Sequence, residues 1–417
     1  MNYLIKAPEK LHIEIHLPAS KSISNRALIL NALCSRPKEI KNISVCDDTD
    51  VMIKALQDEN SEINIEAAGT AMRFLTAYLS VKKGSRTITG TERMKNRPIK
   101  LLVEALQSLG AQIEYIEKEG FPPLHIKGQT LAGGDVSLDG SVSSQYISAL
   151  LMIAPLMTNG MRLHLRGNII SRPYINLTIQ LMRKFGVVVF EEGQSLTIPP
   201  QQYSPVENFT VEADWSAASY WYEMIALCRH ENASVSLPGL LPDSLQGDIS
   251  IVELFDKLGV KTTFTLSGVT LTKKKREINP PLTFDFVSMP DMAQTAVVTC
   301  VMLGIPFKFT GLQSLKIKET DRLDALQNEL GKLGYPLTGY DGKTLQWNGE
   351  RSNAVPSPVI ATYEDHRMAM AFAPVSTCRK EGIRIADPMV VSKSYPSYWN
   401  DLEKTGFSII NNSSVPR

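Results

Sequence analysis

Cysteine is scarce in this sequence, and the few cysteines form no metal-binding pattern. The chain has 5 cysteines among 417 residues, and no two of them make a Cys-x-x-Cys pair. They are Cys34, Cys46, Cys228, Cys300 and Cys378. Neither a zinc site nor a disulfide framework is expected, and no metal or organic cofactor is predicted. A reducing cytoplasm suits such a chain.

Long apolar runs are missing as well. The first residues, MNYLIKAPEK, contain no apolar stretch of signal-peptide length, and no window approaches the ~18 uninterrupted apolar residues of a membrane span. We therefore expect an unexported, cytoplasmic protein with no membrane partner.

The sequence also has no excess of charge of one sign. It carries 44 Lys and Arg residues against 43 Asp and Glu residues, a formal net charge of +1. A protein that wraps nucleic acid usually has a strong basic surplus, so no nucleic-acid partner is expected and any basic site must be local. With 43% hydrophobic and 21% charged residues, the composition is that of a globular protein. A chain of this length should form two or three domains.

Five amphipathic segments of the chain end in glycine and then turn apolar or β-branched. The glycines are Gly110, Gly186, Gly259, Gly334 and Gly406, at intervals of 72 to 76 residues. A glycine that stops a helix by adopting a left-handed conformation accounts for each of them. A shorter relative, DDTDVMIKALQ, lies upstream and lacks the glycine. The chain therefore contains an internal repeat.

A second family of helical stretches alternates with the first and is apolar on nearly every face, which is typical of buried helices. These stretches open at Lys21, Thr70, Ser144, Ser216, Asp291 and His366. Short β-branched stretches such as RTITG and FKFTG lie between the helices, so each repeat should contain strands and two helices. The predicted fold class is α/β (α+β), and six repeats most simply form two domains of three. A solenoid is the competing architecture.

Polar residues cluster where these helices begin. If the repeats superpose, the helix N-termini converge, and their unsatisfied N–H groups and partial positive charges form an anion-binding cleft. The cleft would gather the cations Lys21, Arg26, Arg93, Arg97, Lys318, Arg322, Arg367 and Lys393. We infer that the ligand carries several negative charges.

Helix capping is the competing explanation for these polar residues. Single Ser, Thr and Asp residues at helix starts are ordinary N-caps. A cation at a helix start opposes the helix dipole unless an anion compensates it, so Lys21, Arg322 and Arg367 point more strongly to a ligand. His366 stays open between a structural histidine and a residue of the site.

Taken together, eight segments resemble the successive signature segments of the 5-enolpyruvylshikimate-3-phosphate (EPSP) synthase family. They are LPASKSISNRALIL (17–30), AGTAMRFL (68–75), RMKNRPI (93–99), SSQYISALLM (143–152), PDMA (290–293), KETDRL (318–323), DHRMAMAF (365–372) and SKSYPSYW (392–399). Their order and spacing match, and the resemblance covers essentially the whole chain. It implies a two-domain inside-out α/β barrel built from six repeats, three per domain. Residues 20–212 would form one domain and residues 1–19 plus 213–417 the other, with a hinge at the two crossings.

The resemblance implies a transferase of the shikimate pathway, which leads to chorismate and the aromatic amino acids. The enolpyruvyl group of phosphoenolpyruvate would pass to the 5-hydroxyl of shikimate 3-phosphate, with release of phosphate. The hydroxyl needs a base and the enol carbon needs a proton donor, so carboxylates and cations suffice. By resemblance, Asp291 is the base, Glu319 delivers and removes the methylene proton, and Lys21 contacts both substrates and assists proton transfer. A monomer that acts on two small molecules is expected.

The resemblance also implies two sets of binding residues. Shikimate 3-phosphate would contact Lys21, Ser22, Arg26, Ser143, Ser144, Gln145, Ser171, Tyr174, Asp291 and Lys318. Phosphoenolpyruvate would contact Lys21, Gly69, Arg93, Gln145, Arg322, Arg367 and Lys393. Arginine suits the second set because its planar fork binds carboxylate and phosphate through paired hydrogen bonds. Gly69 would let the backbone approach the substrate closely.

Three positions depart from the family pattern. Ala67 stands where Asn commonly precedes Ala-Gly-Thr, Phe74 where Pro commonly follows the Arg, and Ser314 where a substrate-contacting Asn is usual. None of them removes a charged catalytic group. They bear on the shape of the phosphoenolpyruvate pocket and hence on glyphosate, a family inhibitor that occupies it. Because Gly69 is retained, we expect moderate inhibition.

Two other functions compete with this interpretation. An enolpyruvyl transferase of cell-wall synthesis acts on a UDP-sugar and shares the fold, but it commonly carries a loop Cys that TERMKNRP lacks. The SSQ and KETDRL segments also belong to the shikimate branch. A non-catalytic repeat ring on DNA needs a basic inner face and has little use for Asp291 and Glu319 among the cations. Retention on heparin or DNA at physiological salt would distinguish the ring.

Overall fold

The computed structural model describes residues 1–141 and 143–411. Val142, in the predicted domain 20–212, and residues 412–417, at the end of the second predicted domain, lie outside the described residues. The chain divides into two compact units. We call Ala19–Val211 the N-terminal unit, and Met1–Pro18 together with Glu212–Arg417 the C-terminal unit. The predicted boundaries, 20–212 and 1–19 plus 213–417, differ from these by one residue.

The described residues form five four-stranded sheets that share one topology, a parallel pair extended by two antiparallel strands. The N-terminal unit has the orders β3-β4-β6-β5 and β7-β8-β10-β9. Its strands are β3 (Glu62–Asn64), β4 (Gly84–Thr89), β5 (Gln112–Tyr115), β6 (Leu124–Gly128), β7 (Gly134–Asp139), β8 (Met161–Arg166), β9 (Phe190–Glu192) and β10 (Ser195–Ile198). A repeated topology is what a repeated sequence predicts.

The C-terminal unit has the orders β12-β13-β11-β2, β14-β15-β17-β16 and β18-β19-β1-β20. Its strands are β1 (Asn2–Lys6), β2 (His12–Glu14), β11 (Ser234–Pro238), β12 (Val260–Phe264), β13 (Gly268–Lys273), β14 (Leu282–Asp285), β15 (Phe307–Thr310), β16 (Thr338–Gly339), β17 (Leu345–Trp347), β18 (Val359–Ile360), β19 (Ile383–Ala386) and β20 (Ser408–Asn411).

The first two strands explain why the start of the chain belongs with its second half. β1 lies between β19 and β20, so that Leu4 pairs with Arg384 on one side and Ile410 on the other. β2 pairs in parallel with β11. Where the chain crosses between units, the Asp214 N–H donates to the Pro18 carbonyl at 2.9 Å, which ties the two crossings together.

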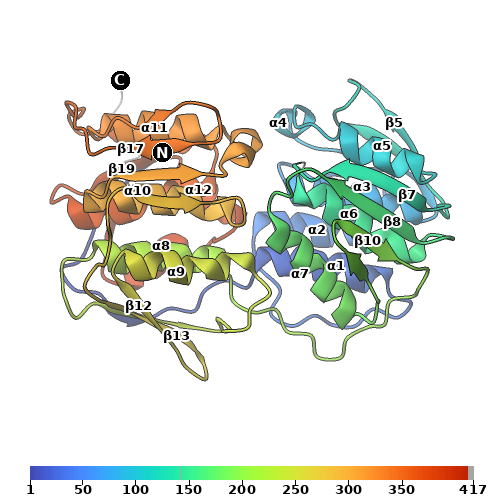
Figure 1. Cartoon of the computed structure of the whole chain (residues 1–417), viewed down its shortest axis with the longest axis horizontal. Helices are drawn as coiled ribbons and strands as arrows, with labels where there is room; N and C mark the ends of the chain where they lie inside the picture. Colours follow the sequence, from blue (N-terminus) through green and yellow to red (C-terminus); the bar gives the residue numbers. More distant parts are fainter. Residues whose placement is uncertain (142, 412–417) are drawn as a thin grey trace. The chain divides into compact units, whose positions relative to one another are not determined.

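Six helices have nearly continuous apolar surfaces and are buried, three in each unit. They are α1 (Lys21–Leu33), α3 (Gly69–Val81), α6 (Ser144–Ile153), α8 (Trp215–Leu227), α10 (Ala293–Leu303) and α12 (His366–Phe372). Within each unit the three helices contact one another, and Figure 1 shows α8, α10 and α12 running side by side. A short helix (η5, Ala373–Cys378) continues α12 without a break. The prediction of three buried helices per unit is confirmed.

The amphipathic helices bury one face and leave the other in solvent. They are α2 (Asp47–Gln57), α5 (Lys100–Ser108), α7 (Arg172–Lys184), α9 (Ile251–Lys257), α11 (Arg322–Lys332) and α13 (Tyr398–Lys404), with α4 (Glu92–Lys95) as an extra turn. The remaining short helices are η1 (Ala154–Leu156), η2 (Gly247–Ser250), η3 (Pro290–Met292), η4 (Gln313–Ile317) and η6 (Pro388–Lys393). The five predicted stop glycines all have φ between 83° and 103°. At such φ a side chain would be strained, so glycine is required there.

The repeat that contains α1 and α2 differs from the other five. Instead of a four-stranded sheet, the described residues show one isolated parallel bridge there, between Lys41 and Thr210. The expectation that every repeat contains strands is therefore wrong for this repeat. The sequence counterparts of that difference are the missing glycine and the interval of 49 residues from Lys21 to Thr70, against 72 to 75 between the later helix starts.

The core of the C-terminal unit contains a carboxyl group. Glu223 lies in the middle of α8 and is 0% exposed. Burial, with a smaller contribution from Cys378, raises the pKa of Glu223 well above its ordinary value. Burial therefore favours the neutral, protonated form of this side chain over its charged form.

This burial predicts a pH-dependent gain in stability for Glu223→Gln. Below the unfolded pKa of Glu, about 4.3, both proteins are neutral at this position. As the pH rises above it, ionisation favours the unfolded wild type, by up to about 1.4 kcal/mol per pH unit until the folded pKa is reached. Urea unfolding between pH 4 and 8 should show the advantage of the variant growing with pH. For Glu403→Gln, an exposed control on α13, the difference in unfolding free energy from the wild type should not change with pH. A pH-independent difference for Glu223→Gln would contradict the raised pKa of Glu223.

Candidate active site

A cluster of ion pairs in the C-terminal unit brings together residues from three separate segments. Asp291 lies in η3 just before α10, and its carboxylate accepts from Arg322 Nη1 at 2.8 Å and from Arg367 Nη2 at 3.1 Å. Lys318 Nζ lies 3.4 Å from the same carboxylate. Arg322 Nη2 donates to Glu319 at 3.0 Å. Five predicted site residues are thus connected in one cluster.

The start of each helix explains why these residues meet. Arg322 opens α11, Arg367 is the second residue of α12, and Asp291 lies in η3, the short helix that directly precedes α10. Asp321 caps α11 by accepting from the N–H groups of Leu323 and Asp324. The helix N-termini therefore present both the cations and the carboxylate, as the sequence predicts.

Asp365 is a member of this cluster that the sequence analysis did not assign to the site. It is 0% exposed, accepts from Arg322 Nε at 2.7 Å, and caps α12 by accepting from the Arg367 N–H at 2.9 Å. Arg322, itself 1% exposed, is held by three carboxylates. An Asp directly before a helix that opens with His-Arg is an N-cap signal, which indicates the cap of α12 but not the contact with Arg322.

The electrostatics of the cluster keep Asp291 ionised. Burial alone would raise the pKa of Asp291, but Arg367, Lys318 and Arg322 together hold the pKa of its carboxyl well below its usual range. With these three cations in contact, the carboxylate is a weak base. It becomes a stronger base only if the cations turn toward another anion.

A second buried acid lies near Asp291. Asp248, in η2, is 3% exposed and accepts a short hydrogen bond from the Ser216 hydroxyl at the start of α8. Burial and then the charge of Asp291 raise the pKa of Asp248 to about 6. The sequence analysis placed Ser216 at a helix start but missed Asp248, whose role depends on a contact distant in the sequence.

In the N-terminal unit, Arg26 is buried and held by several groups. It is 2% exposed and donates to the Ser22 carbonyl at 2.9 Å, to Thr178 Oγ1 at 2.7 Å and to Ser148 Oγ at 3.2 Å. Burial lowers the pKa of Arg26 to about 10. It stays protonated at neutral pH and is fixed in position.

Lys21 opens α1 and donates to Asp48 at 2.9 Å. The carboxylate of Asp48 is 5% exposed and the side chain of Lys21 is 16% exposed. Asp48 compensates the lysine charge at this helix start, a partner that the sequence analysis did not name. A cation at a helix start requires a compensating anion, and for Lys21 the protein itself supplies one in Asp48.

The remaining predicted residues of this unit lie at helix starts. Ser143 caps α6 by accepting from the Gln145 N–H, and the Gln145 side chain donates to Thr70 Oγ1 at 3.1 Å. Ser144 is the first residue of α6. Ser171 precedes α7 with φ 55°, and Tyr174 lies one turn later, with its N–H donating to the Ser171 carbonyl. Ser22, Ser144 and Tyr174 are all partly exposed.

Gly69 opens α3 beside two arginines. A Cβ at this position would come within 2.5 Å of Arg97 Nη1 and 3.0 Å of Arg73 Nη1. Phe74, one of the departures from the family pattern, is 0% exposed, and the Arg26 guanidinium lies over its ring at 5.2 Å. The start of α3 is therefore tightly packed, and the side chains of Arg97 and Arg73 occupy the space that a side chain at position 69 would need.

Two predicted cations lie on short helices. Arg93 belongs to α4 of the N-terminal unit, and Lys393 ends η6 of the C-terminal unit. Both are partly exposed. His366 is 2% exposed, with Nδ1 at 3.8 Å from Asp365, so it is a buried neighbour of the cluster. The residues predicted for each substrate come from both units.

The described part of the chain contains no group of three or more His, Cys, Asp or Glu side chains arranged to hold a metal ion. Among the same residues, no helix has the length and apolar character needed to cross a membrane.

The chain is similar to proteins of one enzyme family over nearly its whole length. The model of that family, EPSP synthase (3-phosphoshikimate 1-carboxyvinyltransferase), matches residues 5–58 and 56–402. A 3-phosphoshikimate 1-carboxyvinyltransferase of Bacteroides fragilis (strain YCH46) is 57% identical over 410 residues, 98% of this chain and 99% of that protein. A protein of the same name from Sulfurovum sp. (strain NBC37-1) is 36% identical, over 94% of this chain and 96% of that protein.

Solved structures agree in fold. An EPSP synthase from Acinetobacter baumannii superposes with a TM-score of 0.78 at 20% identity, covering 98% of this chain and 100% of that one. The enolpyruvyl transferase NikO from Streptomyces tendae superposes with a TM-score of 0.75 at 15% identity, covering 98% of both chains. Enolpyruvyl transferases with different names thus share the fold, whereas the two relatives with 57% and 36% sequence identity carry one name, 3-phosphoshikimate 1-carboxyvinyltransferase. The chain belongs to the EPSP synthase (3-phosphoshikimate 1-carboxyvinyltransferase) family.

Proposed function

We propose that the chain transfers the enolpyruvyl group of phosphoenolpyruvate to the 5-hydroxyl of shikimate 3-phosphate and releases phosphate. The observation that carries this proposal is the cluster around Asp291, in which Arg322, Arg367 and Lys318 all contact one carboxylate. Both substrates are anions, so cations at helix N-termini suit their binding.

The cluster also supports a role for Asp291 as the base. Its basicity is suppressed by the three cations that contact it. When substrate carboxylate and phosphate groups bind those cations, the pKa of Asp291 rises, because the cations then share their positive charge between Asp291 and the substrate. Asp291 can then accept the proton of the 5-hydroxyl as the oxygen attacks the enol carbon. Substrate binding would thereby create the base.

Glu319 is suited to move the second proton. It is 17% exposed and held by Arg322 at 3.0 Å, so its carboxyl can reach a ligand while keeping a fixed position. The methylene carbon takes one proton as the new C–O bond forms and becomes a methyl group. Loss of one methyl proton then accompanies cleavage of the C–O bond to phosphate. One carboxyl group can deliver the first proton and accept the second.

The binding roles follow the predicted sets. We assign Arg322, Arg367, Arg93 and Lys393, with Gly69 and Gln145, to phosphoenolpyruvate. We assign Ser22, Arg26, Ser143, Ser144, Gln145, Ser171, Tyr174 and Lys318 to shikimate 3-phosphate, with Lys21 contacting both. The buried, multiply hydrogen-bonded Arg26 supports a fixed anchor for a substrate anion.

Acceptor dependence tests the function. Purified protein with phosphoenolpyruvate should release phosphate when shikimate 3-phosphate is added, and not with a UDP-sugar or without an acceptor. The carboxyvinyl ether product should appear by NMR in step with phosphate. Release only with the UDP-sugar would place the chain in the cell-wall branch, and no release with either acceptor would reopen the non-catalytic alternative.

Glyphosate should inhibit competitively with phosphoenolpyruvate. A Cβ at position 69 would come within 2.5 Å of Arg97 Nη1, so glycine lets this arginine lie against the start of α3, where it can contact an anionic inhibitor, and this supports the proposal. The tight packing of Phe74 supports moderate rather than strong inhibition. Initial rates at several concentrations of both compounds measure the effect. An enzyme unaffected by millimolar glyphosate would show that Ala67 or Phe74 has reshaped this pocket.

A further inference from the structure

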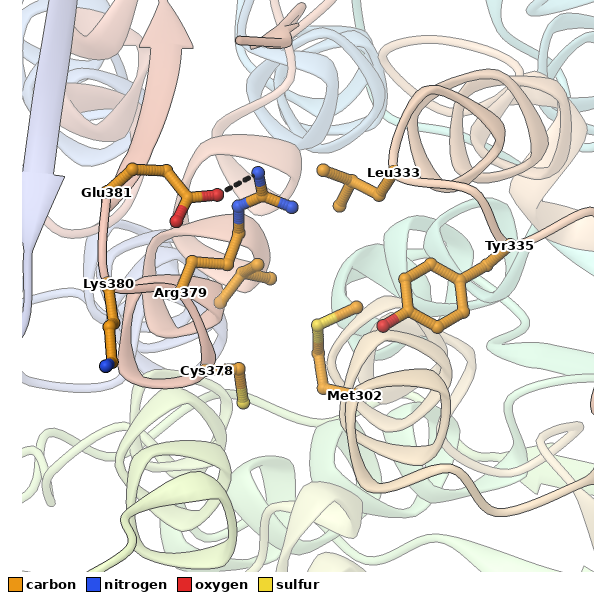
Figure 2. A pocket seen from close by; sticks show the side chains of 8 residues that line it. Met302, Leu333, Tyr335, Cys378, Arg379, Lys380 and Glu381 are labelled. Carbon is orange, nitrogen blue, oxygen red and sulfur yellow. Dashed lines mark hydrogen bonds and ion pairs between the residues drawn. The ribbon is translucent and has the colours of Figure 1, made fainter. Parts of the chain in front are cut away.

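A pocket of about 350 Å³ opens in the C-terminal unit, away from the ion-pair cluster. Figure 2 shows the side chains that line it. Its lining includes Met302, Leu333, Tyr335, Cys378, Arg379 and Glu381. The volume falls at the lower end of the range of about 300–1,000 Å³ that is typical of small-molecule sites. The proposed reaction uses none of these residues.

The pocket lies at the C-terminal ends of the helices that begin at the cluster. α10 starts beside Asp291 and ends at the pocket near Met302. α11 starts at Arg322 and is followed by Leu333, and the continuous α12–η5 helix starts at His366 and ends at Cys378. Eleven residues of helix, as in α10 and α11, span about 16 Å at 1.5 Å per residue. One pocket thus touches all three segments that supply Asp291, Arg322 and Arg367.

The polar side of the pocket has a hydrogen-bond donor available. Arg379 Nη2 pairs with Glu381 Oε1, and Arg379 Nε is buried without a hydrogen-bond partner among the described residues. Lys380 is exposed and belongs to the lining, with its ammonium turned away from the Arg379 guanidinium. In Figure 2 the Arg379 guanidinium extends between Glu381 and Leu333. A buried donor without an acceptor is unfavourable, and an anionic ligand would satisfy it.

The other side of the pocket is apolar and partly aromatic. Met302, Leu333 and Val375 contribute aliphatic and thioether surface. The Tyr335 ring is held against Trp347, with ring centroids 5.7 Å apart, and Arg351 lies over its face at 3.9 Å. A flat apolar body would fit against such a surface. The lining therefore combines an anion-binding edge with an apolar wall.

We propose that this pocket binds a small organic carboxylate with an apolar, aromatic body, and that its occupancy changes the kinetics of the reaction at the other end of the three helices. The carboxylate would accept from Arg379, and the ring would lie against Tyr335, Leu333 and Met302. The kinetic part rests on the proposed function; the binding part does not.

Cys378 provides a reporter inside the pocket. It is partly exposed, whereas Cys34, Cys46, Cys228 and Cys300 are buried. Burial raises the pKa of the Cys378 thiol, so alkylation by neutral iodoacetamide should be followed at mildly alkaline pH. In the folded protein, mass spectrometry should find one modified site, and Cys378→Ser should remove it. A ligand in the pocket should slow the reaction.

The binding test compares three probes. 3-Phenylpropionate should protect Cys378 from alkylation. 3-Phenylpropionamide, which lacks the charge, should bind at least about tenfold more weakly and protect correspondingly less. Propionate, which lacks the ring, should protect equally poorly. Equal protection by the amide would overturn the assignment of a carboxylate, and no protection by 3-phenylpropionate at millimolar concentration would overturn the site.

Two variants of the ion pair should act in opposite directions. Arg379→Gln should weaken 3-phenylpropionate about tenfold by removing the charged donor. Glu381→Gln should tighten it, because the guanidinium then has no competing carboxylate. Arg379 is partly exposed and Glu381 is exposed, so the fold should persist in both variants, and thermal unfolding checks this. Unchanged affinity in Arg379→Gln would contradict the proposed pose.

Filling the pocket tests the link to activity. Met302→Trp should abolish protection and mimic occupancy, whereas Leu303→Trp is the matched control, since Leu303 is also partly exposed but lines a separate cavity of about 290 Å³. With saturating 3-phenylpropionate, kcat or KM for phosphoenolpyruvate should change at least twofold in wild type and not in Met302→Trp. Binding of 3-phenylpropionate with unchanged kinetics would overturn the kinetic coupling but not the binding site. Failure of the proposed function would instead show as no activity in the wild type or in any variant.

Discussion

Replacing Asp291 by asparagine is expected to lower kcat by roughly 10²–10⁴-fold, the usual contribution of a general base. Asparagine keeps the size of the side chain and one acceptor oxygen, so Arg322 and Arg367 can stay in place. The amide cannot take the proton of the 5-hydroxyl. KM for phosphoenolpyruvate should not rise, because the cations that we assign to this substrate remain.

The same variant should change the response to anions. Arg322, Arg367 and Lys318 lose the carboxylate that they share, so their mutual repulsion is no longer compensated. Inorganic phosphate should therefore raise the melting temperature of Asp291→Asn more than that of wild type at equal ionic strength. Asp285→Asn, at an exposed carboxylate on β14, is the matched control. Wild-type kcat in Asp291→Asn would remove Asp291 from the mechanism.

The largest effect on stability is expected from Asp365→Asn. Removing one partner of a buried ion pair leaves the other charge uncompensated and costs about 3–5 kcal/mol. Here the stranded partner is Arg322, which is 1% exposed, although Asp291 and Glu319 still contact it. The loss should therefore lie toward the lower end of that range. Asparagine is a good N-cap, so the cap of α12 is retained and the measured loss reports the charge.

A neighbouring cap supplies the control for this variant. Asp321 caps α11 with a side chain that is 27% exposed, so Asp321→Asn should change the free energy of unfolding by less than about 1 kcal/mol. Urea unfolding measures both variants. Asp365 is a positioning residue, so Asp365→Asn should also raise KM for phosphoenolpyruvate through a displaced Arg322, an effect that a purely structural role would not produce. Equal stability losses in the two variants would contradict the buried-pair explanation.

Much of the fold could be predicted from the sequence because each repeat carries its own local signals. Gly110 and its four counterparts end helices, and the apolar stretches that became α3, α6, α8 and α10 could only be buried. The sheet partners could not be predicted in the same way. Nothing local in residues 2–6 indicates that β1 lies between β19 and β20, since strand pairing depends on contacts distant in the sequence.

Membership of the ion-pair cluster was predictable for a cation at a helix start, because such a cation requires a compensating anion. Arg322 and Arg367 are of this kind. Asp365, Asp48 and Asp248 were missed because an aspartate near a helix start is an ordinary cap, and only burial and a distant partner distinguish these three. Asp365 pairs with Arg322, Asp48 pairs with Lys21, and Asp248 accepts from Ser216, contacts that depend on tertiary packing.

Phosphate release by Glu319→Gln tests the central claim most directly, namely that the cluster around Asp291 performs the transfer. With phosphoenolpyruvate and shikimate 3-phosphate, the wild type should release phosphate, while Glu319→Gln should be slower by at least about 10²-fold because the amide cannot carry the methylene proton. Glu403→Gln should match the wild type. Release by Glu319→Gln at the wild-type rate would contradict the account and move the proton transfer to another group.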